Sequence, residues 1–207
     1  MDKKELQNPA LYTNRELSWL LFNKRVLSEA RDKQLLLFER LKFLSITASN
    51  LDEFFMVRIG SLVDMIHAEY TKKDIAGMSA KEQLDALMEE THKFAALQYS
   101  TYNRMLLPQL RANGLNFVEH HEQLTERQAQ YVDEYFEENV YPVLTPMAVD
   151  SSRPFPLIRN KTLNIGALVA KKGEKDTEIE FATVQVPSVL PRVVRIPAAV
   201  SYTHLRA

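Results

Sequence analysis

Cysteine is absent from the 207 residues of this sequence, and glycine occurs only five times. The lack of cysteine excludes disulfide frameworks, thiol nucleophiles and cysteine-bound metals. The glycines form no G-x-x-x-x-G-K phosphate loop, and no G-x-S-x-G serine motif is present. The phosphate loop and the serine motif are therefore excluded along with thiol catalysis, and we assign no catalytic residue to this chain.

An excess of one charge and long apolar runs are also missing. The net charge is -1 and the pI is about 6.5, which leaves no basic surface for a nucleic acid. No apolar run approaches the roughly 20 residues that span a bilayer, and the N-terminus lacks the apolar core of a secretory signal. We expect a soluble, cytoplasmic protein with no transmembrane segment and no nucleic-acid partner.

Of the five histidines, only two lie together in the sequence, at His120-His121. A metal site needs further ligands in suitable geometry. The nearby Glu119 and Glu122 are adjacent in the sequence rather than spaced along one helix face. We interpret the cluster as a solvated turn and assign no metal ligand.

The first 112 residues show the periodic apolar pattern of long helices. Thr13-Asn14-Arg15-Glu16 fits a capping box, with Thr13 as the N-cap of the first helix. A second helix should begin near Gln34 and be interrupted by a polar break at Ser49-Asn50. Because long helices joined by short loops favour antiparallel neighbours, residues 1–112 are predicted to form an antiparallel helical bundle.

A third long helix is predicted to begin at a second capping box, Ser79-Ala80-Lys81-Glu82. Pro108 should kink or end this helix because proline lacks the backbone N–H. Asn113-Gly114 has the composition of a helix C-cap. We place a domain boundary near residue 113.

The pattern changes in residues 113–200, which we expect to form a second, partial α/β domain. Residues 115–118 are predicted to be a short strand, and Thr125 should open a helix that runs to about Val140. The prolines between Tyr141 and Pro156 exclude a long helix there.

Two segments near the end of the chain alternate as strands do, at residues 162–171 and 178–187. They flank a charged turn at Gly173, which predicts a β-hairpin. Residues 193–196 are a candidate third strand. The predicted fold class is therefore α+β: an antiparallel helical bundle followed by a partial α/β domain with a β-hairpin.

One polar amide stands beside two carboxylates and two aromatic residues, in the sequence Asn50-Leu51-Asp52-Glu53-Phe54-Phe55. An asparagine at a helix break is most often an N-cap, and Glu53 at N3 fits that role. Alternatively the amide faces a purine, because it offers an acceptor and two donors that can match a base edge. The residues by themselves leave both roles open for Asn50.

The neighbours of Asn50 also have two interpretations each. Asp52-Glu53 point about 100° apart on a helix, so they cannot act as a paired acid and base on one atom. Phe54-Phe55 are expected in the core, with stacking on a base as the alternative. Arg58 is expected in an ion pair, with a phosphate contact as the alternative. Trp19 is expected to anchor the bundle core.

Two runs of the sequence resemble a known family. The first resembles the N-terminal domain of polyphosphate kinase, the bacterial enzyme that polymerises the terminal phosphate of ATP, and reads RELSWLLFNKRVL followed by LFERLKFLSITASNLDEFFMVRIGSL. The second resembles the start of that family's head domain and reads VYPVLTPMAVDSSRPFPLIRNKTLNIGALV. The resemblance covers roughly residues 12–197.

The resemblance implies that Asn50 contacts the adenine end of ATP and that the head domain supports a homo-oligomer. It places the phosphorylated histidine and the contacts to Mg²⁺ and polyphosphate in C-terminal domains that are not in this chain. ATP and polyphosphate are thus the expected partners of the whole enzyme, and this chain alone is expected to be inactive. The implied location is the cytoplasm, or a kinase complex peripheral to the membrane.

The last seven residues, SYTHLRA at 201–207, depart from the family pattern, and we expect a truncated or wrongly joined reading frame there. The alternative to the kinase interpretation is a non-enzymatic helical module for interaction or dimerisation, in which residues 141–156 pack against another subunit. ATP binding that Asn50→Ala weakens would favour the first interpretation. An oligomer mass that depends on concentration, with no nucleotide effect, would favour the second.

Overall fold

The computed structural model describes three ranges of the chain, residues 5–149, 155–170 and 179–197. The chain divides into two compact units, Met1–Phe117 and Val118–Ala207, and each is described by itself. The predicted turn at Gly173 and the tail at 201–207 lie outside the described residues.

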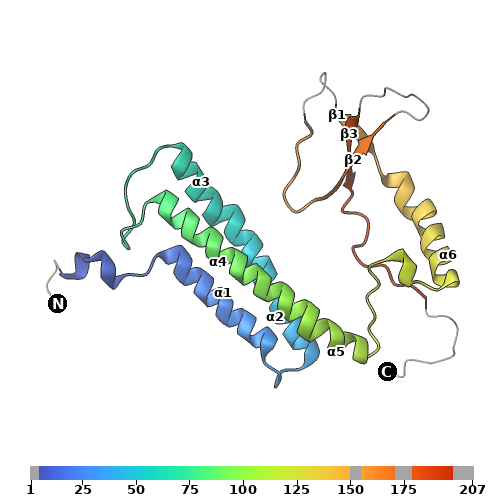
Figure 1. Cartoon of the computed structure of the whole chain (residues 1–207), viewed down its shortest axis with the longest axis horizontal. Coiled ribbons are helices and arrows are strands. Elements are labelled where there is room, and N and C mark those ends of the chain that lie inside the picture. Colours follow the sequence, from blue (N-terminus) through green and yellow to red (C-terminus); the bar gives the residue numbers. More distant parts are fainter. Residues whose placement is uncertain (1–4, 150–154, 171–178, 198–207) are drawn as a thin grey trace. The chain divides into compact units, whose positions relative to one another are not determined.

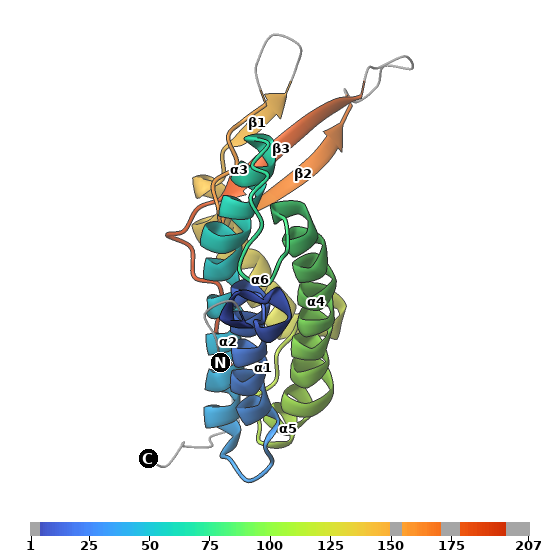
Figure 2. The ribbon, with the colours of Figure 1, turned by 90° about the vertical axis from the view of Figure 1, so that its left-hand side faces the viewer.

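The first unit is an antiparallel bundle of helices, as predicted (Figure 1). Its helices are α1 (Arg15–Arg31), α2 (Leu37–Phe54), α3 (Gly60–His67), α4 (Ala80–Ser100) and α5 (Leu107–Ala112), preceded by 3₁₀ turns at Glu5–Gln7 and Pro9–Leu11. π-helical turns at Phe55–Ile59 and Thr101–Leu106 join α2 to α3 and α4 to α5. Figure 2 shows α2 and α4 on either side of α1.

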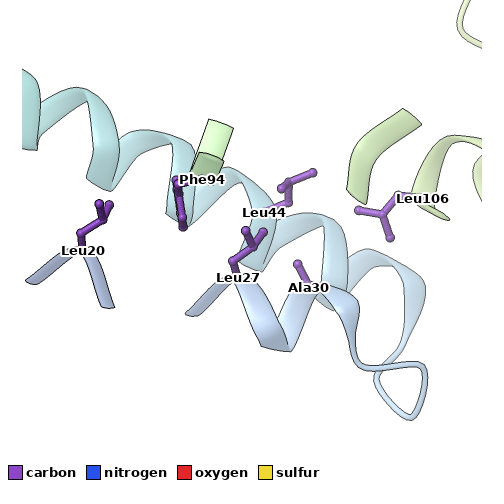
Figure 3. Packing of buried hydrophobic residues seen from close by; sticks show 6 residues of the cluster. All are labelled: Leu20, Leu27, Ala30, Leu44, Phe94 and Leu106. Carbon is purple, nitrogen blue, oxygen red and sulfur yellow. The ribbon is translucent and has the colours of Figure 1, made fainter. Parts of the chain in front are cut away.

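Two apolar clusters hold this bundle together. Leu20 and Leu27 lie two turns apart on α1 and belong to the same cluster as Phe94 of α4 (Figure 3). The other buried members of this cluster are Ala30, Leu44 and Leu106. The buried members of the second cluster are Phe54, Ile59, Leu62, Ala80 and Leu87. Because burying one such large side chain contributes roughly 1.5–3 kcal/mol, the clusters account for the packing of these helices.

The caps of the helices are partly as predicted. Ser79 forms the expected capping box, with Glu82 N–H donating to Ser79 Oγ (3.3 Å) and Ser79 N–H donating to Glu82 Oε2 (2.7 Å). The prediction that Thr13 caps α1 is wrong, because Asn14 is the N-cap and accepts from Glu16 N–H and Leu17 N–H. An asparagine side chain is at least as good a cap as threonine, and the helix begins one residue later than expected.

The predicted helix break at Ser49-Asn50 is wrong. The α2 helix begins at Leu37 and continues without interruption to Phe54. The irregularity follows it, as the π-helical turn at Phe55–Ile59, after which α3 continues the same path. The helix tolerates these two polar side chains because Ser49 is exposed to solvent and Asn50 hydrogen-bonds to Asn23 on α1.

Pro108 does not end the helical path, which continues through α5 to Ala112. It lies in the first turn of α5, where the missing proline N–H costs least, directly after the π-helical turn at Thr101–Leu106. The predicted C-cap is confirmed: Gly114 has φ +83°, and Leu115 N–H donates to Leu110 O (2.9 Å).

The second unit contains helix α6 (Glu126–Tyr135), extended by a π-helical turn at Phe136–Val140, and a small antiparallel sheet of β1 (Pro146–Val149), β2 (Leu163–Val169) and β3 (Glu180–Val186). The strand order is β1-β3-β2. The predicted hairpin is confirmed, since β2 and β3 pair antiparallel with Ile165 opposite Val184.

Two strand predictions for this half of the chain are wrong. Neither residues 115–118 nor residues 193–196 form a strand. The third strand is β1, which lies in the proline-rich segment and pairs with β3, Ala148 opposite Ala182. Proline is compatible with this position because Pro146 is the first residue of an edge strand.

An ion pair between α1 and α4 makes the stability of the first unit depend on pH. Lys24 Nζ lies 2.6 Å from Glu90 Oε2, and Lys93 Nζ lies 2.9 Å from Glu90 Oε1. Hydrogen bonds from Lys24 and then from Lys93 lower the pKa of Glu90 from 4.5 to about 2. A lowered folded-state pKa contributes stability that is present above the unfolded pKa and is lost as the pH falls through about 2.

We therefore expect Glu90→Gln to lose less stability than the natural chain between pH 5 and pH 3. The difference should be below about 1 kcal/mol, because solvent screens the pair. Urea unfolding at both pH values, followed by the fluorescence of the single tryptophan, Trp19, measures it. Glu89→Gln is the matched control, since it removes only a pair within α4. Equal pH dependence of the natural chain and Glu90→Gln would contradict the expectation.

Candidate functional site

A pocket of about 270 Å³ opens beside Asn50 in the first unit. It is formed by α1, by the last turn of α2 and by the π-helical turn that follows. Its lining residues are Trp19, Phe22, Asn50, Glu53, Phe54, Val57 and Arg58. Drug-sized ligands occupy pockets of roughly 300–1,000 Å³, so this volume suits one ring system rather than a whole nucleotide.

Asn50 is half-buried and lines this pocket. The interpretation of Asn50 as a helix cap is wrong, because the residue lies inside α2, one turn before its end. Its Nδ2 donates to Oδ1 of Asn23 on α1 (3.0 Å). In the part of the chain that the structure describes, no hydrogen bond is made to Asn50 Oδ1. The amide therefore has an unused acceptor at a solvent-open pocket.

The aromatic residues divide between core and pocket. Phe54 is buried and stacks on Trp19, with ring centroids 4.4 Å apart and planes 6° apart. Phe55 contacts Phe54 edge-on. Trp19 packs against both apolar clusters, as predicted for a core anchor, and also lines the pocket. Phe22 is largely exposed, with the Arg25 guanidinium 5.9 Å from its ring centroid.

The charged residues near Asn50 face in different directions. Glu53 lines the Asn50 pocket, whereas Asp52 lines an apolar pocket of about 360 Å³ between α2 and α4. This separation follows from the 100° step between helix neighbours. Arg58 Nη1 lies 3.8 Å from Glu16 Oε1, which agrees with the expected ion pair. The pocket thus has no concentrated positive charge for a triphosphate.

Metal and membrane sites have no counterpart in the described residues. Within them, no group of three or more histidine, aspartate or glutamate side chains is arranged to hold a metal ion. His121 instead lies in a solvated turn, with Nε2 3.1 Å from Asp133 Oδ1. No helix of the described ranges has the length and apolar character needed to cross a bilayer.

The sequence singled out Asn50 but did not group it with the residues of α1 that lie around it. Trp19, Phe22 and Asn23 have the i, i+3 and i+4 spacing that places side chains on one side of a helix. This spacing is the signal that would have grouped them. It does not show that the group faces Asn50, which is 27 residues further along the chain from Asn23.

The fold is that of an α+β protein whose helical N-terminal unit carries a small, partly aromatic pocket. The family models described as "Polyphosphate kinase N-terminal domain" and "Polyphosphate kinase middle domain" match residues 12–118 and 127–206. The chain belongs to the polyphosphate kinase family, as its sequence resemblance predicted.

Relatives of known name agree with this assignment. The polyphosphate kinase of Lactiplantibacillus plantarum is 53% identical over 188 residues, which cover 91% of this chain and 26% of the relative. That of Halalkalibacterium halodurans is 47% identical over 93% of this chain and 27% of the relative. The crystal structure of polyphosphate kinase from Porphyromonas gingivalis matches with a TM-score of 0.70 and 31% identity, over 89% of this chain and 27% of that one. The chain spans about a quarter of the length of these relatives.

Proposed function

We propose that this chain is the part of a polyphosphate kinase that holds the adenine end of ATP. In the whole enzyme the terminal phosphate of ATP would be transferred to a growing polyphosphate chain. The observation that carries the proposal is the position of Asn50, which lines a pocket with an unused amide acceptor beside aromatic side chains. The name shared by the relatives supplies the reaction.

The chemistry of the pocket supports a base rather than a phosphate as the occupant. Asparagine can make a two-point contact with adenine, and aromatic walls such as Phe22 can stack on a base. The cation that lines the pocket, Arg58, is paired with Glu16, and Glu53 adds a negative charge. Phosphoryl transfer depends on positioning and on neutralising charge. The triphosphate and Mg²⁺ are therefore assigned to other parts of the enzyme, and this chain alone is proposed to be inactive.

Replacing Asn50 with alanine is expected to weaken ATP binding by the chain about tenfold, which corresponds to about 1.4 kcal/mol. The physical reason is the loss of the amide contact to the base. Isothermal titration calorimetry measures the dissociation constant, and urea unfolding checks that the bundle remains folded. Asn103→Ala is the matched control, because Asn103 is an exposed helical asparagine remote in sequence from this pocket. An unchanged dissociation constant in Asn50→Ala would refute the assignment.

We propose a second role for the chain in forming a homo-oligomer through its second unit. Several large apolar side chains of this unit are exposed, among them Leu157, Leu168 and Val189. Such side chains favour a covered surface in the whole protein. A molecular mass that rises with protein concentration in analytical ultracentrifugation would support this role. If the chain does not bind ATP, forming the homo-oligomer is the alternative function that we propose for it. The proposed location of the enzyme is the cytoplasm, or the periphery of a membrane.

A further inference from the structure

We propose that Asn23 selects the nucleobase, by fixing which atom of the Asn50 amide a base meets. The inference rests on the proposed function and deepens it. Asn23 lies on α1 and is fully buried. It is a positioning residue: it does not line the pocket, and it would act only through Asn50.

A chain of hydrogen bonds runs from the backbone of α2 through α1 and back to α2. Asn23 Nδ2 donates to Thr47 O (3.1 Å), and Asn50 Nδ2 donates to Asn23 Oδ1 (3.0 Å). Thr47 is itself fully buried. Both bonds connect α1 to α2, so the packing of these two helices holds the two linked hydrogen bonds in place.

The direction of this chain is determined by its first member. A backbone carbonyl can only accept, so the amino group of Asn23 must face Thr47 O. The Oδ1 atom of Asn23 then faces Asn50, so Asn50 must donate to it through its own amino group. If the Asn50 amide were flipped, its Oδ1 would lie about 3.0 Å from Asn23 Oδ1 in place of Nδ2. Two acceptors would then face each other, and the buried Asn23 Oδ1 would have no donor. Asn50 therefore keeps Oδ1, and one N–H beside it, for a ligand in the pocket.

This fixed orientation discriminates between purines that differ at position 6. For a base held against the aromatic walls with position 6 at Asn50 Oδ1, the 6-amino group of adenine donates to that oxygen. The remaining N–H of Asn50 can then donate to a ring nitrogen, which gives a two-point contact. A 6-oxo purine, such as guanine or hypoxanthine, would place its O6 acceptor against Asn50 Oδ1, so it would lose the contact at position 6 in that pose, although its N7 can still accept from the remaining N–H.

The test compares ATP with inosine triphosphate on the 207-residue chain by calorimetry. We expect ATP to bind at least tenfold more tightly. Asn23→Leu removes the acceptor that holds Asn50, so the preference should fall to within about threefold. Asn23→Asp also loses the donor to Thr47 but keeps an acceptor for Asn50, and it should retain the preference. A purely structural role of Asn23 would give the two variants the same selectivity.

The possible results separate the inference from the proposed function. Equal binding of the two nucleotides by the natural chain would overturn the inference and leave ATP binding intact, and this comparison needs no variant to fold. A preference for ATP that persists in folded Asn23→Leu would overturn it as well. No binding of either nucleotide to the natural chain would overturn the proposed function, and the inference with it.

Discussion

Phe94→Ala is expected to remove a large part of the stability of the first unit. Phe94 is fully buried and packs in the same cluster as Leu20, Leu27 and Leu106. Truncating a buried phenylalanine to alanine costs about 3–5 kcal/mol, because apolar contacts are lost and a cavity remains. Whole domains are stable by only about 5–15 kcal/mol. Urea unfolding followed by Trp19 fluorescence measures the change, and the probe reports this unit alone because the chain has one tryptophan.

Phe38→Ala is the matched control for this experiment. The chemical change is the same, and Phe38 also lies on a helix, but its side chain is 62% exposed. Its replacement should change the free energy of unfolding by less than about 1 kcal/mol. Equal effects of the two substitutions would show that Phe94 does not pack in the core that we describe.

Asn14→Ala is expected to destabilise the first unit by about 2–4 kcal/mol, which combines the loss of a helix cap with buried groups left unsatisfied. Asn14 is buried and uses both ends of its amide. Its Oδ1 caps α1, and its Nδ2 donates to Asp74 Oδ2 (2.7 Å) and Gln83 Oε1 (2.8 Å). The residue therefore joins the start of α1 to the loop before α4 and to α4 itself.

Asn8→Ala is the control that removes a cap alone, without side-chain hydrogen bonds such as those of Asn14 to Asp74 and Gln83. Asn8 also accepts a backbone hydrogen bond, from Ala10 N–H, but it is exposed and serves only a short 3₁₀ turn. We expect a loss below about 1 kcal/mol there. In Asn14→Asp the cap acceptor remains while the donor to Asp74 and Gln83 is lost, so this variant should still be destabilised at neutral pH. Full stability of Asn14→Asp would mean that the links to Asp74 and Gln83 contribute little.

Much of the fold follows from local patterns in the sequence. The capping box at Ser79, the C-cap at Gly114 and the hairpin strands β2 and β3 were predictable, because each depends on residues close together in the chain. The wrong predictions concern competition between similar local signals. Thr13 and Asn14 are both good caps, and which of them starts the helix depends on partners 60 and 69 residues away.

The third strand was missed for a related reason. Residues 193–196 have the apolar composition of a strand, whereas β1 contains a proline at its start. Pairing, however, depends on what lies beside the edge of β3. Composition carries no information about that neighbour, so local propensity favoured the wrong segment.

The sequence by itself indicated the family, the helical first unit and the hairpin strands β2 and β3, and it singled out Asn50, the amide that we propose to bind a base. Only the tertiary structure decided that α2 runs unbroken past Asn50 and that its amide is held by Asn23. The physical reason is that helix periodicity is a short-range property, while the orientation of an amide is set by hydrogen bonds through space. Those bonds join residues 24 and 27 positions apart, a relation that no local pattern records.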